Sequence, residues 1–297
     1  MTYSIVARDP ATGALGVAVQ TCMFAVGAGV PWARAGVGAV SSQAMTEPAY
    51  GPRCLDAMEA GADAEEALER ARSVDPAPFL RQVGVVGADG TVATTTGEFC
   101  IDHAGHVLGD GFAVQANMMV SPDVWPAVAE TYRASSAPFP RRLLDALNAG
   151  QAAGGDARGV MSAALVVVDG ERAEPWAGRA VDLRVDRSDD PLGDLARLLD
   201  ASIAFTSFHE AVDALTTGNA DAALAGVNRA LAQLPGDENL RFLRAGALAA
   251  TGDTDGVRDE LKSLVAARPG WETVIRSFAA KGLVAAPPGV TIDDLLA

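Results

Sequence analysis

Residues 2–20 read TYSIVARDPATGALGVAVQ and carry the clearest indication of fold in the chain. Tyr3–Arg8 is short and rich in residues that favour strands, and Leu15–Cys22 is a second apolar strand candidate. Asp9–Gly13 lies between them and contains the proline and glycine that are typical of turns. The stretch therefore predicts a β-hairpin at the start of this sequence.

Strand and helix patterns continue to about residue 187. Val37–Gln43 is a third strand candidate, and a second hairpin is predicted around the turn Ala88–Gly90. Antiparallel strands separated by helix pairs predict the α+β class, with two antiparallel sheets covered by layers of helices. Residues 97–111 have no clear period and are expected to form a loop. The other predicted elements are helices over 48–61, 64–74, 121–134 and 140–149, and strands over 82–87, 91–96, 112–118, 160–168 and 180–185.

The sequence from Leu192 onward is predicted to be entirely helical. Gly218-Asn219 recurs 34 residues later as Gly252-Asp253, and Leu234-Pro235 recurs at the same spacing as Arg268-Pro269. A 34-residue helix–turn–helix period is the signature of tetratricopeptide (TPR) repeats. The predicted domains are therefore 1–187, the α+β domain, and 188–297, a small all-α TPR-like domain. Because about three repeats are needed for independent stability, the helices are expected to pack on the first domain or on a second copy of the chain.

Composition excludes several classes of function. The chain has 297 residues, 49% of them hydrophobic, and a net charge of -15, so nucleic-acid phosphates and anionic lipid would repel it. No signal peptide and no apolar run of 18 residues is recognisable, and the three cysteines fit no metal or redox motif. A cytoplasmic protein with no nucleic-acid or membrane partner is expected. No nucleotide-binding motif is present, and no cofactor is predicted.

Thr2 is the leading candidate for a nucleophile. Once Met1 is removed, the α-amine of Thr2 has a pKa of about 7.7–8.0 and can act as the base for its own hydroxyl. Methionine before a small residue is normally trimmed, and the predicted strand would hold Thr2 rigidly. The alternative reading is that Thr2 is only a β-branched residue in a strand.

Several stretches resemble the bacterial family catalogued as domain of unknown function 1028. The resemblance covers roughly residues 2–187, and it implies a four-layer αββα sandwich of the N-terminal-nucleophile (Ntn) hydrolase type with the nucleophile at Thr2. It supplies no substrate. One departure is Met161, where the family usually has glutamine, which implies altered specificity, reduced activity or only a packing substitution. The stretches are 2–20, VGAGVPWARAGVGAVSSQ (26–43), YGPR (50–53), RQVGVV (81–86), GHVLGDGFAVQANM (105–118) and AGQAAGGDARG (149–159).

The glycine-rich segment 154–159 is the second candidate site. Its glycines allow close backbone approach to a ligand, and Arg158 offers a fork for a substrate carboxylate. Asp156 would hold either Arg158 or the Thr2 ammonium group, and the alternative is a loop closed by a local Asp–Arg pair. The predicted catalytic residues are Thr2, Asn117, Ser42 and Asp156, and the predicted substrate-binding residues are Arg158, Gln43, Gln115, Gly155, Ser162 and His106.

Two further groups of polar residues have alternative interpretations. The amides or side chains of residues 41–43, Gln115 or Asn117 would donate to an oxyanion, or would only form turn-capping hydrogen bonds. His103 and His106 are three residues apart, but no third ligand follows at a usual spacing, and no metal is predicted.

The leading hypothesis is a hydrolase that cleaves a small amide or related acyl bond through Thr2. The alternative is a catalytically inactive Ntn-fold protein whose TPR-like helices recruit a peptide or a cell-wall partner. A homo-oligomer is expected, and dimerisation is a third role for the helices.

Overall fold

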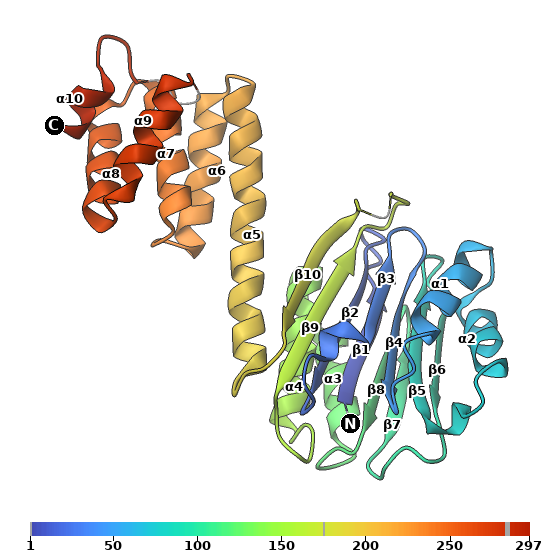
Figure 1. Ribbon diagram of the computed structural model, residues 1–297. Coiled ribbons are helices and arrows are strands. Elements are labelled where there is room, and N and C mark those ends of the chain that lie inside the picture. The colour runs from blue at the N-terminus through green and yellow to red at the C-terminus, as the bar shows by residue number, and fades with distance from the viewer. Residues whose placement is uncertain (1, 175, 283–285) are drawn as a thin grey trace. The chain divides into compact units, whose positions relative to one another are not determined.

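The computed structural model describes residues 2–174, 176–282 and 286–297. The chain forms two compact units, Met1–Leu199 and Asp200–Ala297, each described here by itself (Figure 1). We call them the sandwich unit and the helical unit. The structure confirms the α+β class, because antiparallel sheets precede an all-helical region.

The first sheet of the sandwich unit is built around the predicted hairpin. Its strand order is β10-β9-β2-β1-β8-β7, with every neighbouring pair antiparallel. β1 therefore lies in the interior of the sheet, between β2 and β8, and its residues 2–7 are buried. The strands are β1 (Thr2–Arg8), β2 (Leu15–Thr21), β7 (Gly105–Gly109), β8 (Phe112–Asn117), β9 (Ser162–Val168) and β10 (Arg179–Val185).

The second sheet has the order β3-β4-β5-β6 and contains the predicted second hairpin. The sequence did not predict β3 or β7. Both are short edge strands, β3 begins with a proline, and β7 has glycine at each end, so neither has the composition of a strand. The strands are β3 (Pro31–Arg34), β4 (Gly38–Ala44), β5 (Arg81–Gly87) and β6 (Val92–Thr96).

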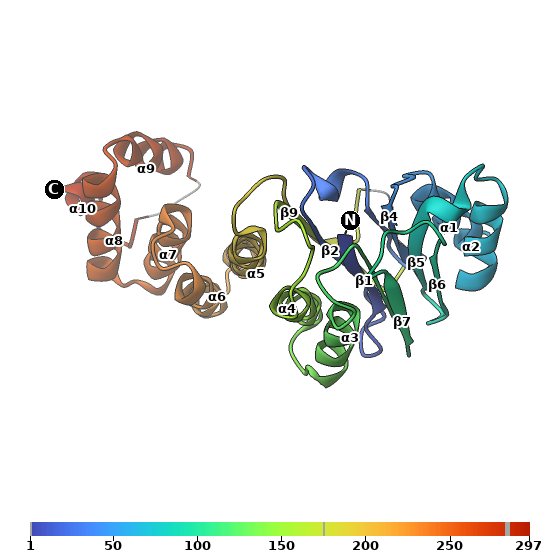
Figure 2. The ribbon, with the colours of Figure 1, turned by 90° about the horizontal axis from the view of Figure 1, so that it is seen from below.

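The layers follow from the alternation of side chains along each strand. Ile5 of β1 packs against the helices behind the first sheet, whereas its neighbour Val6 packs against the second sheet. Three apolar clusters fill the spaces between the layers, which therefore run helices, sheet, sheet, helices (Figure 2). The covering helices are α1 (Tyr50–Glu59) and α2 (Ala64–Ser73) on the second sheet, and α3 (Val124–Ala134) and α4 (Phe139–Ala152) on the first; η1 (Val26–Ala28) and η2 (Pro78–Leu80) are 3-10 turns.

The helical unit repeats with the spacing read from the sequence. Helix α8 begins at Thr254, 34 residues after α6 begins at Ala220, and the side chains of Asn219 and Asp253 cap the two helices in the same way. The division between the units falls inside α5, because Leu192, Leu195 and Leu199 belong to the core of the sandwich unit. The helices are α5 (Pro191–Thr216), α6 (Ala220–Gln233), α7 (Glu238–Thr251), α8 (Thr254–Ala267), α9 (Gly270–Ala280) and α10 (Ile292–Leu296). In the described parts of the chain, none of the helices has the length and apolar character needed to cross a membrane.

A substitution at Gly84 in β5 tests how closely the two sheets approach each other. A Cβ atom added there would lie 2.2 Å from Nε2 of Gln115 on the facing sheet. We expect Gly84→Ala to lower the free energy of unfolding by about 1–3 kcal/mol, because the core has no room for the methyl group. Urea denaturation measures this. Gly29→Ala is the control, since its nearest neighbours would be 4.0 Å away; equal stability of the two variants would contradict the close approach.

Candidate functional site

The sheet topology places Thr2 among the loops at one end of the sandwich. β1 begins at Thr2, and its antiparallel neighbours β2 and β8 end beside it, at Thr21 and Asn117. β4 ends and β5 begins on the facing sheet, where Gln43 and Gln82 are paired in register. We call this the Thr2 end of the sandwich. Figure 2 views the molecule from this side and shows the N-terminal end of β1 near the middle of the unit.

Thr2 is buried and is held through both its side chain and its backbone. It is only 5% exposed, and its Oγ1 donates to Oγ1 of Thr21 at 3.2 Å. Its carbonyl oxygen accepts a hydrogen bond from Nε2 of Gln43 at 3.0 Å and a second from Nδ2 of Asn117 at 3.3 Å. Two predicted site residues therefore contact Thr2 directly, one from each sheet.

Gln82 connects these two amides. Its Oε1 accepts from Nε2 of Gln43 at 2.7 Å and from Nδ2 of Asn117 at 2.8 Å. Its Nε2 donates to the carbonyl of Ala116 at 2.8 Å and to Oγ1 of Thr96 at 2.9 Å. An amide NH2 group has two hydrogens, so both donors of Gln43 and Asn117 are engaged between Thr2 and Gln82. In this structure the two side chains position the Thr2 backbone.

Gln115 lies deeper between the sheets than Thr2. It pairs in register with Ser4, two residues beyond Thr2, and it is fully buried. Ser4 Oγ donates to Gln115 Oε1 at 3.1 Å and lies 2.7 Å from Oγ of Ser41 on the facing sheet. This residue, predicted to bind substrate, is part of the polar layer beneath Thr2.

Ser42 lies on the opposite face of its strand. Side chains alternate along β4, so Ser41 and Gln43 face the first sheet while Ser42 faces α1 together with Val40. Ser42 Oγ donates to the carbonyl of Glu47 at 2.9 Å. The structure therefore does not bring the Ser42 side chain to Thr2.

Asp156 holds the glycine-rich loop against the end of β2. Its side chain is fully buried, accepts from the amide of Cys22 at 3.1 Å, and forms an ion pair with Arg158 at 3.0 Å. The neighbouring Gly155 has a φ of +61°, in the region that favours glycine, and its carbonyl accepts from the amide of Val120 at 3.0 Å. Burial, and then the charge of Asp156, raise the pKa of Tyr3 well above its usual range. The local Asp–Arg pair, the alternative interpretation of this segment, is present.

Ser162 and His106 lie at the margins of the site. Ser162 Oγ donates to the carbonyl of Met23 at 2.6 Å and accepts from the amide of Val26 at 3.1 Å, so it fixes the turn that follows β2. His106 Nδ1 lies 2.9 Å from Oγ1 of Thr96, and burial lowers the pKa of His106. Among the described residues, no group of three or more His, Cys, Asp or Glu side chains is arranged to hold a metal ion.

Two residues of the site were missed from the sequence. Thr21 is recoverable by counting outward from the hairpin turn, because the register pairs it with Thr2. No pattern in the sequence indicated that Gln82 belongs to the site. Its role depends on how the second sheet faces the first, and a local pattern does not encode that pairing.

Backbone strain gathers at the same end of the sandwich. The non-glycine residues of the described chain with positive φ are Ala25, Ala44, His103 and Met118, at +55°, +71°, +54° and +56°. Each lies in a loop or at a strand end at the Thr2 end of the sandwich, and each costs on the order of 1–3 kcal/mol. Strained residues of this kind cluster at functional sites, so their position supports the Thr2 end as the site.

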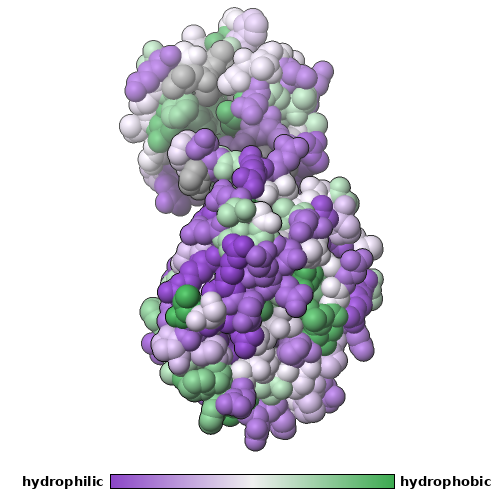
Figure 3. All heavy atoms as spheres, turned by 90° about the vertical axis from the view of Figure 1, so that its right-hand side faces the viewer, coloured by the Kyte–Doolittle hydropathy of each residue, from purple (hydrophilic) through white to green (hydrophobic). Residues whose placement is uncertain are grey.

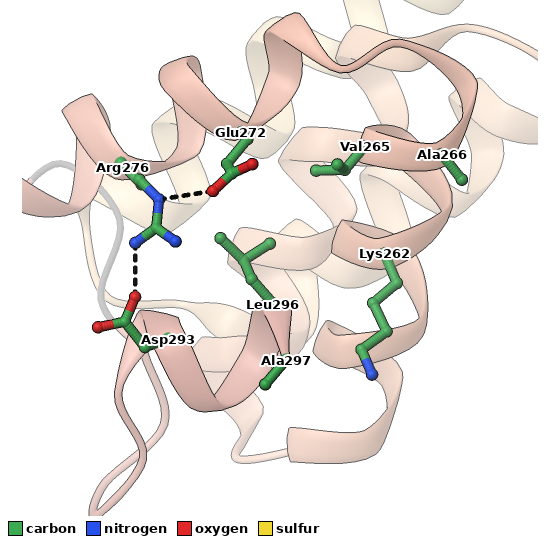
Figure 4. A pocket seen from close by; sticks show the side chains of 8 residues that line it. All are labelled: Lys262, Val265, Ala266, Glu272, Arg276, Asp293, Leu296 and Ala297. Atoms are coloured by element: carbon green, nitrogen blue, oxygen red, sulfur yellow. Dashed lines mark hydrogen bonds and ion pairs between the residues drawn. The ribbon is translucent and has the colours of Figure 1, made fainter.

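We interpret one pocket of the helical unit as part of the packing of that unit and not as a binding site. Its volume is about 430 Å³ (Figure 4). Arg276 donates to Glu272 at 3.0 Å and to Asp293 at 2.6 Å, so its charge is neutralised by residues of the unit itself. The lining residues are Lys262, Val265, Ala266, Glu272, Arg276, Asp293, Leu296 and Ala297.

The fold and site together define an αββα sandwich with a pinned threonine at the start of a central strand, followed by a helical unit. The chain belongs to the family of unknown function DUF1028, whose sequence model matches residues 2–195. It is similar to the crystal structure of protein SPO2555 from Silicibacter pomeroyi, described under the same family. The two chains are 34% identical, the match covers 67% of this chain and 84% of that one, and the TM-score is 0.61. No curated protein matches this chain.

Replacing Gln82 tests the amide network. In Gln82→Leu the donors of Gln43 and Asn117 lose their shared acceptor, and each unsatisfied buried donor costs about 1–3 kcal/mol. We expect the free energy of unfolding to fall by roughly 2–6 kcal/mol in urea denaturation. Thr94→Val is the control, because it removes a single hydrogen bond, from Thr94 in β6 to the carbonyl of Val83 in β5. Similar losses in the two variants would contradict a central role for Gln82.

Asp75 makes the stability of the folded protein depend on pH in the acid range. Its side chain is 1% exposed and pairs with Arg81 at 2.9 Å, while Arg81 also donates to the carbonyl of Met45 at 2.7 Å. The hydrogen bond from Arg81 is the main cause that lowers the pKa of Asp75 to about 2. The folded-state pKa is below the unfolded one, so the pair stabilises the protein above about pH 4, and this is lost as the pH falls toward about 2.

Asp75→Asn should therefore flatten the loss of stability between about pH 4 and pH 2. Thermal unfolding midpoints measured across this range test the expectation. Glu98→Gln, in an exposed loop at the same end, is the control. A variant profile as steep as that of the unchanged protein would show that Asp75 is not the titrating group.

Proposed function

We propose that this protein is an N-terminal-nucleophile hydrolase that cleaves a small amide or related acyl bond through Thr2 after removal of Met1. The observation that carries the proposal is the fixed position of Thr2. Its carbonyl is held by Gln43 and Asn117, and its hydroxyl lies against Thr21 at the start of a central strand. The αββα layering and the strain in the surrounding loops support it.

The proposed reaction needs no residue outside Thr2 for proton transfer. The α-amine takes the proton from Oγ1 as Oγ1 attacks the carbonyl carbon, giving a tetrahedral oxyanion. The amine then returns the proton to the leaving nitrogen as the C–N bond breaks, which leaves an acyl-threonine ester. Water, deprotonated by the same amine, hydrolyses the ester and restores Oγ1–H. An amine pKa of about 7.7–8.0 leaves part of the group in its free form at neutral pH.

Asn117 is the proposed donor to the oxyanion. Its bond to the Thr2 carbonyl, at 3.3 Å, is longer than the 3.0 Å bond from Gln43. The bond from Asn117 is therefore the less costly one to exchange for a bond to the oxyanion, while Gln43 keeps Thr2 in place. We propose that Arg158, held by Asp156, binds a carboxylate of the substrate.

Labelling of Thr2 tests the proposal. Untagged protein is incubated with a β-lactone, and the mass of its N-terminal peptide is measured. We expect loss of Met1 and a covalent adduct on Thr2, with a rate that rises with pH through about 7.7–8.0, because the free amine is the base. Thr2→Ser should label, since it keeps the hydroxyl, and Thr2→Ala should not.

Thr12→Ala is the matched control. Thr12 lies in the turn at the other end of the hairpin, where its hydroxyl donates to Asp9. Its labelling should equal that of the unchanged protein. A free N-terminal Thr2 that never forms an adduct, or equal labelling of Thr2→Ala, would sink the proposed mechanism.

A second candidate function is binding through the helical unit. Its repeated helix pairs are similar in spacing to TPR repeats, and they form an apolar pocket of about 590 Å³. We propose a peptide or cell-wall fragment as its partner if Thr2 proves inert, so the labelling experiment separates the two functions. The apolar lining residues include Phe208, Val212, Leu215, Phe242, Leu243 and Phe278.

A further inference from the structure

Large apolar side chains are exposed around Thr2. They are 41–68% exposed and lie in the loops that surround the Thr2 end of the sandwich. In Figure 3, hydrophobic residues (green) are visible at the lower end of the sandwich unit, the end at which β1 begins in Figure 1. We call this group the apolar rim. It consists of Met23, Phe24, Met45, Phe79, Phe99, Ile101 and Val120.

The rim is tied to the residues that hold Thr2. Each strand of the network other than β1 has a rim residue within three positions of its network residue, so at most about 11 Å of chain separates the two. Met23 follows Thr21 by two residues, and Met45 follows Gln43 by two. The other pairs, each three residues apart, are Asn117 with Val120, Gln82 with Phe79, and Thr96 with Phe99.

Backbone hydrogen bonds join the rim loops to one another. The amide of Met118 donates to the carbonyl of Ile101 at 3.2 Å, and the amide of Phe99 donates to the carbonyl of Phe79 at 3.1 Å. The amide of Met45 donates to the carbonyl of Leu80 at 3.3 Å. These bonds hold the exposed side chains in fixed loops, so the rim exists before any ligand binds.

We infer that the substrate of Thr2 carries a bulky apolar group beside the scissile acyl bond, and that the apolar rim receives it. The inference rests on the proposed function, which places the scissile bond at Thr2. Exposed apolar side chains gathered at one end of a protein mark binding sites, and here the rings of Phe79 and Phe99 pack edge to face with centroids 5.4 Å apart. The two methionines can adapt to an irregular alkyl or aryl shape. Arg158, which is ion-paired with Asp156, lies at one side of the rim, with its Nη1 3.4 Å from the sulfur of Met23.

Binding is measured first, because it needs no chemistry. The Thr2→Ala protein is titrated calorimetrically with N-octanoylglycine amide and with N-acetylglycine amide. Burying part of the octanoyl chain should make the first amide bind at least tenfold more tightly. Phe24→Ser and Ile101→Ser in the same background should each weaken octanoyl binding several-fold and leave acetyl binding unchanged.

Trp176→Ser is the matched control. Trp176 is 82% exposed, but it lies between β9 and β10, at the opposite end of the sandwich. This variant should bind the octanoyl amide as tightly as its Thr2→Ala parent. Unfolding midpoints equal to the parent's establish that all three serine variants are folded.

Three results would overturn the inference. One is equal affinity for the two amides, or no binding of either. Another is unchanged octanoyl binding in both rim variants. The third is that the unaltered protein sediments as a dimer and that Phe24→Ser or Ile101→Ser converts it to a monomer. That result would make the rim an interface between copies of the chain.

The same materials separate this inference from the proposed function. If the octanoyl amide binds through the rim but no β-lactone ever labels the unaltered protein, the nucleophile proposal fails and the apolar ligand remains. If octyl- and methyl-substituted β-lactones label Thr2 at equal rates and the two amides bind equally, the nucleophile stands and the apolar group is excluded.

Discussion

The pinned carbonyl of Thr2 is the constraint on which the rest of this site depends. A buried carbonyl at the end of a strand needs a partner, and here it has two, Gln43 from one sheet and Asn117 from the other. Gln82 joins both donors, so a polar network spans the sheets at this end. Buried networks of this kind are rigid when every member is satisfied, because the low local dielectric strengthens each bond.

The rigid network explains where the strain and the exposed apolar side chains are tolerated. Ala44 and Met118 have positive φ values immediately after Gln43 and Asn117, and Ala25 follows β2 by four residues. A strained residue persists only where its surroundings determine its conformation. The network fixes the backbone at the ends of its strands. The loops that follow can therefore keep strained φ values that an unconstrained loop would lose.

Sequence patterns predicted the parts of this arrangement that depend on local periodicity. The strand-forming residues on both sides of the turn Asp9–Gly13 predicted the hairpin, and β1 and β2 are almost completely buried in the interior of the first sheet. Strict alternation of side chains along β4 would have favoured Ser41 over Ser42, because only every second residue of β4 faces the first sheet. Gln82 could not be found in this way, since its bonds to Asn117 and Ala116 depend on how the second sheet packs on the first. The edge strands β3 and β7 lack the composition of strands.

The network contacts the backbone of Thr2 more than its hydroxyl, as the proposed mechanism requires of a nucleophile that carries its own base. The relation between the α-amine and Oγ1 is set by rotation within a single residue. Fixing the carbonyl at one side and Oγ1 against Thr21 at the other leaves little freedom for that rotation. A separate histidine base would need its own positioning residues. In the proposed mechanism, the positioning of one backbone group would align nucleophile and base together, and this would account for amides from two sheets that converge on a carbonyl with no part in the chemistry.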